Sequence, residues 1–119
     1  MTTTTSTADL QQSAINTIRT LSMDAVQAAN SGHPGTPMAL APVAYSIYAD
    51  QLNYDPADPN WMGRDRFILS CGHASMLLYS MIHLSGIQKT DDQGKATGEP
   101  AITLDDIKNF RQLHRPTAG

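Results

Sequence analysis

The sequence predicts an α/β fold in which a parallel sheet is flanked by helices and most of the chain is helical. Apolar residues recur at three- and four-residue steps in several stretches, which is the spacing of amphipathic helices. A continuously apolar run at residues 67–69 is followed by a glycine-containing turn and another helical stretch, the order found in half of a βαβ unit. With 119 residues, the chain forms one small domain at most.

The first predicted helix covers residues 9–30, where Ile18 and Leu21 belong to a single apolar face. Ser6 lies three residues before Asp9 and is expected to cap the start of this helix. Residues 1–8, which are rich in Thr and Ser, are expected to form a disordered tail. A tight loop at residues 31–35 should end the helix, because glycine and proline do not favour its continuation.

The second predicted helix covers about residues 38–52, with Thr36 as its N-cap and Pro37 at its first position. Pro42 costs little if the helix begins near Leu40, whereas a kink is expected if it begins at Pro37. Residues 53–60 contain two prolines and are predicted to be an irregular connection.

Residues 67–69 are predicted to form a central strand that is buried on both faces of the parallel sheet. The following helix, residues 74–85, is apolar around much of its circumference and is expected to be largely buried before it ends at Gly86. The polar stretch at residues 88–101 is interpreted as a flexible excursion.

A final helix is predicted to open at Thr103, which forms a capping box with Asp106. Ile107, Phe110 and Leu113 are expected to share its apolar face. The helical pattern does not continue through residues 114–119.

Composition excludes several classes of function. The net charge is −3 and no cluster of Lys and Arg occurs, so nucleic-acid binding is not expected. No apolar run approaches the roughly 20 residues that cross a bilayer, and the N-terminus does not resemble a signal peptide, so neither a membrane location nor secretion is expected. A single cysteine, Cys71, fits a reducing cytoplasm. The four histidines are 40, 10 and 31 residues apart, which does not fit a zinc site.

Two histidines stand in turns that are suited to ligand contact. His73 precedes a helix whose free N–H groups and partial positive charge favour an anion such as phosphate. His33 lies between glycine and proline residues that hold its imidazole in a fixed direction, and imidazole is suited to proton exchange. Spacing alone leaves both open, because a structural turn at His73 and an exposed loop histidine at His33 explain the patterns as well.

The remaining titratable candidates are interpreted as structural. His83 falls in the middle of a helix and His114 in the irregular C-terminal segment. Cys71 follows a buried strand, where a lone cysteine is usually a small packing residue rather than a nucleophile. Asp65 lies between Arg64 and Arg66 and is expected to form an ion-pair cluster at the entrance of the strand.

Taken together, the histidine turns and their flanking residues resemble the opening of transketolase. The similar segments are residues 31–38 (Ser-Gly-His-Pro-Gly-Thr-Pro-Met), residues 64–74 (Arg-Asp-Arg-Phe-Ile-Leu-Ser-Cys-Gly-His-Ala) and residues 77–79 (Leu-Leu-Tyr). The resemblance extends over about residues 9–113. It implies the thiamine-diphosphate-binding fold, with this stretch as the N-terminal part of the diphosphate-binding domain and residues 114–119 as a divergent or truncated end.

The resemblance also implies a function. Transketolases transfer a two-carbon ketol group from a ketose phosphate to an aldose phosphate in the pentose phosphate pathway, and the chemistry belongs to thiamine diphosphate. By this resemblance His33 is a catalytic and substrate-binding residue that faces the substrate oxygens and assists proton transfer, while His73 contacts the cofactor diphosphate. Cys71 stands where many members have asparagine. A cytoplasmic homodimer is implied, with Mg or Ca held by ligands outside this chain.

Several family features do not occur in these 119 residues. They are a Pro-Gly-His-Pro-Glu segment with a third active-site histidine, the Gly-Asp-Gly and Asn metal motif, and the glutamate that activates the aminopyrimidine. His114 does not replace the missing histidine, because its surroundings differ. The isolated chain is therefore expected to be inactive, as the N-terminal piece of a transketolase. The alternatives are a non-catalytic module that packs against another chain, or a fragment of the related dihydroxyacetone synthase; deoxyxylulose-phosphate synthases and phosphoketolases fit less well.

Overall fold

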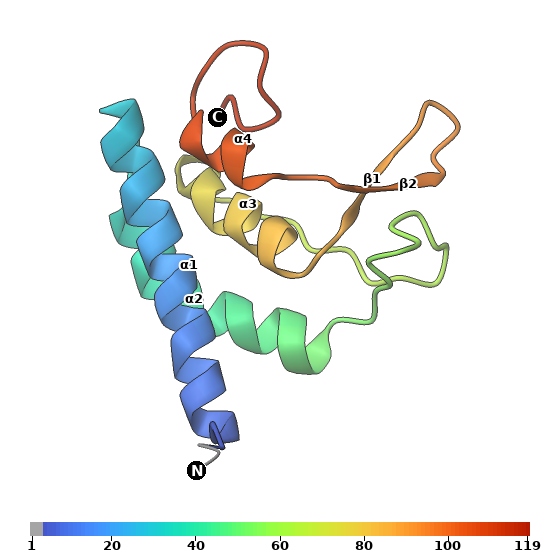
Figure 1. The fold of residues 1–119 in the computed structure, drawn as a ribbon, viewed down its shortest axis with the longest axis horizontal. Coiled ribbons are helices and arrows are strands. Elements are labelled where there is room, and N and C mark those ends of the chain that lie inside the picture. Colours follow the sequence, from blue (N-terminus) through green and yellow to red (C-terminus); the bar gives the residue numbers. More distant parts are fainter. Residues whose placement is uncertain (1–3) are drawn as a thin grey trace.

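The computed structural model describes residues 4–119 as a set of packed helices with one small hairpin. Figure 1 shows α1 along one side of the molecule, α3 beside it, and the hairpin projecting from the opposite side. The elements are α1 (Thr7–Ala29), α2 (Gly35–Ser46), the π-helix η1 (Ile47–Gln51), the 3₁₀-helix η2 (Gly72–Ala74), α3 (Ser75–Leu84), β1 (Gln88–Thr90), β2 (Ala96–Pro100) and α4 (Leu104–Lys108).

Helix α1 confirms the first predicted helix and its cap. The backbone N–H of Asp9 donates to Ser6 Oγ at 3.1 Å, and the Ser6 hydroxyl donates to the Asp9 carboxylate at 2.7 Å. The helix ends at Asn30, which adopts the left-handed conformation that asparagine tolerates at such a position. Residues 1–3 of the predicted tail lie outside the described residues, and residues 7 and 8 already belong to α1.

Helix α2 begins earlier than its predicted start. It opens at Gly35 after Pro34, so Thr36 lies within the first turn and is not its N-cap as predicted. The helix therefore contains Pro42, and the ribbon of α2 and η1 changes direction along this stretch (Figure 1). This is the kink expected for the earlier start, because proline removes a helical hydrogen bond and crowds the preceding turn.

Two apolar clusters form the core. The first joins α1, α2 and α3 with η1, and small side chains such as Ala41 and Ala44 let these helices approach closely. The second joins α1 and α3 to α4, and it includes Phe110, whose ring lies 6.2 Å from that of Tyr79. Helix α3 buries Met76, Leu77, Ser80 and Met81, whereas Leu84 at its end is 44% exposed, so the helix is only partly covered.

The predicted central strand is wrong for the described part of the chain. Residues 67–69 form no strand, and Ile68 is 85% exposed, although a strand buried on both faces would cover it. Phe67 instead packs its ring 5.4 Å from that of Tyr48. A strand exists only where a neighbouring strand supplies ladder hydrogen bonds, and residues 4–119 provide no parallel neighbour. The two-stranded antiparallel sheet is therefore all the sheet that these residues form.

The predicted flexible excursion at residues 88–101 is a β-hairpin. Strands β1 and β2 pair antiparallel with a register irregularity. The turn between them is fixed by the Asp91 carboxylate, which accepts hydrogen bonds from the N–H groups of Gln93 and Lys95, both at 2.9 Å. Asparagine and aspartate stabilise turns in this way, so a polar composition here indicates a hairpin turn and not a flexible loop.

The C-terminal segment packs against a short α4. The predicted capping box between Thr103 and Asp106 is present. Helix α4 ends at Lys108, five residues before the predicted end, so Leu113 is 81% exposed rather than on an apolar helix face. Thr117, by contrast, is fully buried and donates its hydroxyl hydrogen to the Asp106 carbonyl at 2.6 Å. Among the described residues, no helix is both long and apolar enough to cross a membrane.

Candidate functional site

The fold brings the two predicted histidine turns together. The ring centroids of His33 and His73 are 5.4 Å apart and the ring planes cross at 77°, an edge-to-face arrangement. His33 lies in the loop between α1 and α2, and His73 lies in η2 at the start of α3. Both side chains are exposed to solvent. Residues 40 positions apart in the sequence therefore form one accessible pair.

The loop that carries His33 depends on Gly32. Its φ of +121° is a backbone conformation that L side chains rarely adopt. An added Cβ would lie 3.2 Å from Cε1 of Phe110 and 3.3 Å from Cγ2 of Val26, so the loop passes directly over the second apolar cluster. The core therefore fixes the path of the loop, and His33 follows one residue later.

The turn that carries His73 is held by its own backbone and by one buried residue. The Gly72 N–H donates to the Ser70 carbonyl at 3.1 Å, and the Ala74 N–H donates to the Cys71 carbonyl at 2.9 Å. Ala74 has no exposed surface, so it anchors the turn in the interior while His73 points outward. Cys71 is a partly buried free thiol, which fits its interpretation as a packing residue.

A hydrogen bond joins the two turns. Oγ1 of Thr36, in the first turn of α2, lies 3.2 Å from Nε2 of His73. The backbone N–H groups of Gly35, Thr36 and His73 have no hydrogen-bond partner within residues 4–119. Helix α2 has 12 residues, and no side chain caps its first N–H groups. Free N–H donors at a helix start beside two imidazoles fit the oxygens of a phosphate or diphosphate.

The other candidate residues lie outside this pair. His83 Nδ1 donates to the Ile102 carbonyl at 2.9 Å, so this ring ties α3 to the segment before α4, in agreement with its structural interpretation. His114 is exposed in the C-terminal segment. The predicted ion-pair cluster around Asp65 is wrong, because its carboxylate accepts hydrogen bonds from the backbone and side chain of Asn53, at 2.8 and 3.1 Å. The ion pairs of the described residues involve Arg115.

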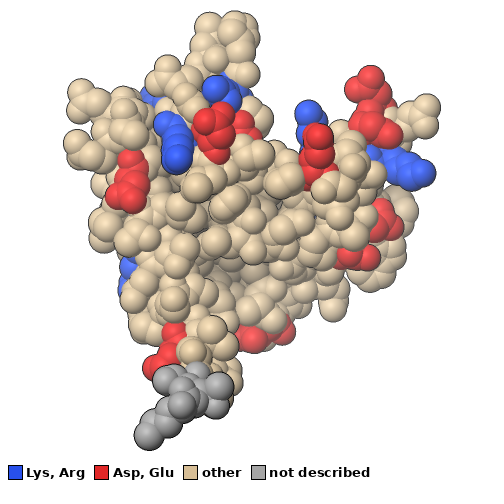
Figure 2. Space-filling model, in the orientation of Figure 1, with Lys and Arg blue, Asp and Glu red and all other residues tan. Residues whose placement is uncertain are grey.

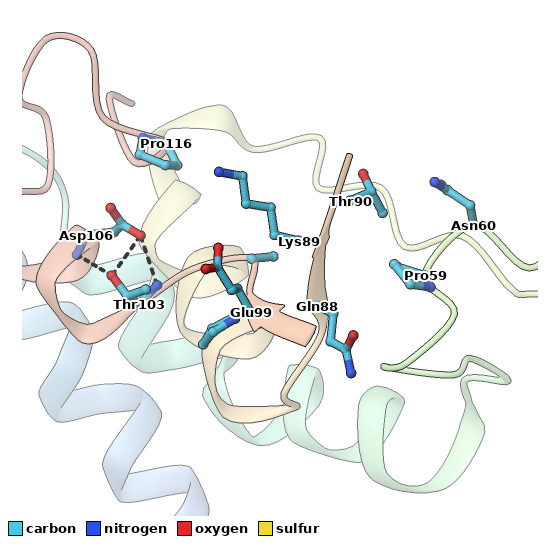
Figure 3. Close-up of a pocket in the computed structure, with 11 residues that line it drawn as sticks. Pro59, Asn60, Gln88, Lys89, Thr90, Glu99, Thr103, Asp106 and Pro116 are labelled. Carbon is cyan, nitrogen blue, oxygen red and sulfur yellow. Dashed lines mark hydrogen bonds between the residues drawn. The ribbon is translucent and has the colours of Figure 1, made fainter. Parts of the chain in front are cut away.

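A second concave region lies away from the histidines. A hollow of about 840 Å³ separates the hairpin from the C-terminal segment (Figure 3). Lys89 and Glu99 extend from the hairpin on one side, and both are exposed. On the other side Asp106 is already engaged with Thr103 in the capping box. No predicted site residue lines this hollow, so the histidine pair remains the candidate site.

The surface charge adds no competing site on the face that Figure 2 shows. Acidic and basic side chains are interspersed there, and large areas between them are uncharged. No patch of Lys and Arg is visible on this face, in line with the acidic net charge of −3.

Comparison with known proteins identifies the class of the domain. Residues 10–119 match the family described as "Transketolase, thiamine diphosphate binding domain". Transketolase from Geobacillus stearothermophilus is 49% identical over 110 residues, which are 92% of this chain and 14% of that protein. The crystal structure of transketolase from Campylobacter jejuni gives a TM-score of 0.78 at 45% identity, over 92% of this chain and 15% of that one. A Pichia stipitis transketolase variant in complex with fructose 6-phosphate gives a TM-score of 0.77 at 46% identity, over 91% of this chain and 14% of that one.

The family match over residues 10–119 thus assigns the chain to a thiamine-diphosphate-binding domain. The chain belongs to the transketolase family, as its sequence motifs predicted. It spans about 14% of the length of the curated relatives that it matches. The family match reaches residue 119, whereas the motifs suggested a resemblance as far as residue 113.

Sequence reasoning missed two residues at the site. Thr36 was interpreted as a helix cap, but its hydroxyl faces His73. Arg19 was overlooked in the middle of α1, although its side chain reaches the first turn of α2. Pro42 was the available signal for the contact of Arg19. It stands four residues after Met38 and has no N–H, so it leaves the Met38 carbonyl without its helical donor.

Proposed function

We propose that this chain supplies part of the cofactor and substrate site of a transketolase. His73 binds the diphosphate of thiamine diphosphate, together with the free N–H groups at the start of α2. His33 faces the substrate oxygens and exchanges a proton with them. The observation that supports this assignment is the contact between the two imidazoles, at 5.4 Å between centroids, beside unpaired backbone donors.

The chemistry of each residue follows from its position. Thiamine diphosphate, when bound, supplies the nucleophilic carbon that permits cleavage of the ketose C–C bond. His73 is held at Nε2 by Thr36 and presents its remaining ring edge to the oxygens of the diphosphate. His33 has no hydrogen-bond partner within residues 4–119, and an imidazole in this state accepts or donates a proton at a substrate hydroxyl.

The finer features of the family extend the proposal. The substrates are a ketose phosphate donor and an aldose phosphate acceptor, and the reaction belongs to the pentose phosphate pathway. A divalent metal, Mg or Ca, is held by ligands outside these 119 residues. The active protein is a cytoplasmic homodimer, and the isolated chain has no ketol-transfer activity of its own. A non-catalytic interaction module or a dihydroxyacetone synthase fragment is less favoured, because the matched relatives are transketolases.

Substitutions in the complete transketolase that carries this sequence test the proposal. His73→Ala should weaken thiamine-diphosphate binding by roughly 10- to 100-fold, the value of a hydrogen bond to a charged group. His33→Ala should lower kcat/KM by about 10²-fold or more while cofactor affinity changes little. His114→Ala is the matched control, because that histidine is remote from the pair in the sequence and equally exposed. Unchanged cofactor affinity in His73→Ala would remove this residue from the diphosphate site.

A further inference from the structure

The first turn of α2 is attached to α1 through an unusual contact. In a regular helix the N–H of residue 42 would donate to the carbonyl of Met38, but residue 42 is proline and has no N–H. Arg19 supplies the missing donor: its Nε donates to the Met38 carbonyl at 3.0 Å in a partly buried position. The donor is charged and the carbonyl lacks its helical partner. This hydrogen bond is therefore a strong one, because charge-assisted hydrogen bonds are stronger than hydrogen bonds between neutral groups.

The same turn carries the hydroxyl that faces His73. Thr36 is half-buried, and its Oγ1 is 3.2 Å from His73 Nε2. This hydroxyl makes no other hydrogen bond within residues 4–119. The imidazole of His73 is exposed, so little packing limits its rotation apart from the edge of His33. The direction of the His73 ring therefore depends on Thr36, and the position of Thr36 depends on the turn that Arg19 holds.

We propose that Thr36 and Arg19 are positioning residues for His73: Thr36 fixes the orientation of its imidazole, and Arg19 holds the turn that presents Thr36. In a neutral imidazole one nitrogen donates and the other accepts, and the partner of one nitrogen decides which is which. A hydroxyl can donate to Nε2 or accept from it, so in either case a hydroxyl fixed beside Nε2 orients the ring and leaves Nδ1 free for a ligand. This inference rests on the proposed role of His73 at the diphosphate.

The test uses the full chain, with no cofactor, and the ¹⁵N chemical shifts of its histidine rings. Thr36→Val keeps the shape of the side chain and removes its hydroxyl, so the Nε2 and Nδ1 shifts of His73 should change. Thr36→Ser should restore them. His83, whose Nδ1 is bound to the Ile102 carbonyl, is the internal control and should keep its shifts in both variants. Arg19→Met should move the His73 shifts in the same direction, and Arg19→Lys should move them less.

Binding of inorganic pyrophosphate by the same variants separates this inference from the proposed function. Thr36→Val should weaken binding by about two- to tenfold, the range of one hydrogen bond, and Thr36→Ser should not. Unchanged His73 shifts in Thr36→Val would overturn the positioning role of Thr36, and unchanged shifts in Arg19→Met would overturn that of Arg19. If Thr36→Val perturbs the backbone spectrum as a whole, Thr36→Ala takes its place under the same criteria. Altered shifts in a chain that does not bind pyrophosphate would leave the positioning intact and refute the diphosphate role.

Discussion

Substitution of Gly32 by alanine tests how the core fixes the loop of His33. Alanine at a φ of +121° would adopt a sparsely populated backbone region, at a cost of about 1–3 kcal/mol. The new methyl group would lie 3.2 Å from the Phe110 ring and 3.3 Å from Val26, and overpacking of this kind costs about 1–3 kcal/mol more. Lower entropy of the unfolded chain offsets about 0.4–1 kcal/mol. The expected net loss of unfolding free energy is about 1–5 kcal/mol.

Urea denaturation followed by circular dichroism measures this loss, and Gly35→Ala is the matched control. Gly35 lies three residues away, at the first position of α2, with no atom within 4 Å of an added Cβ and no positive φ. Alanine there should stabilise the chain by about 0.5–1 kcal/mol, because it is the better helix former. If Gly32→Ala were as stable as the unsubstituted chain, the close approach of the loop to Phe110 and Val26 would be wrong.

Two further predictions concern buried polar groups. The Ser80 hydroxyl is fully buried without a hydrogen-bond partner within residues 4–119, so Ser80→Ala should raise the unfolding free energy by about 1 kcal/mol. Ser22→Ala is the control: it removes a hydrogen bond to the Ile18 carbonyl and should lower the unfolding free energy. A lower unfolding free energy in Ser80→Ala would show that the Ser80 hydroxyl has a hydrogen-bond partner. Burial, with a smaller contribution from Tyr54, raises the pKa of Tyr48 to about 12 from 10.0. The folded state then holds this proton more tightly than the unfolded state. The contribution of Tyr48 to the unfolding free energy is therefore fully present below pH 10 and is lost as the pH rises through 12, with a loss of about 1.4 kcal/mol at pH 11. Between pH 9 and pH 11 the unfolding free energy of Tyr48→Phe should fall less than that of the unsubstituted chain. Equal losses would show that the phenol is exposed to solvent and that its pKa is not raised.

Local patterns in the sequence were sufficient to predict that the helices exist and to predict two of their N-caps, although not the start of α2 or the end of α4. The bonds of Ser6 with Asp9 and of Thr103 with Asp106 depend on residues three positions apart, so short-range spacing determines them. The spacing of apolar residues in α1 likewise predicted which side of the helix is buried, and Ile18 on that side is buried in the structure.

Features that depend on distant partners were not predictable in this way. The apolar run at residues 67–69 has the composition of a strand, but a strand needs a neighbour, and Ile68 is left exposed where none is present. The hairpin at residues 88–100, by contrast, depends on a local turn at Asp91, and its polar residues were interpreted as a flexible excursion instead of a turn. The two histidine turns were singled out by their glycine and proline neighbours, and the structure brings them together. Their contact is tertiary, because it joins residues that are 40 positions apart in the sequence.

The most direct test of the cofactor site is a titration of the complete transketolase that carries this sequence with thiamine diphosphate, observed through the ¹⁵N shifts of the His33, His73, His83 and His114 rings. The signals of His33 and His73 should move together and saturate, while those of His83 and His114 stay constant. Movement of His83 or His114 with His33 and His73 unaffected, or no saturable change in any ring, would contradict the assignment of the paired histidine turns to the cofactor site.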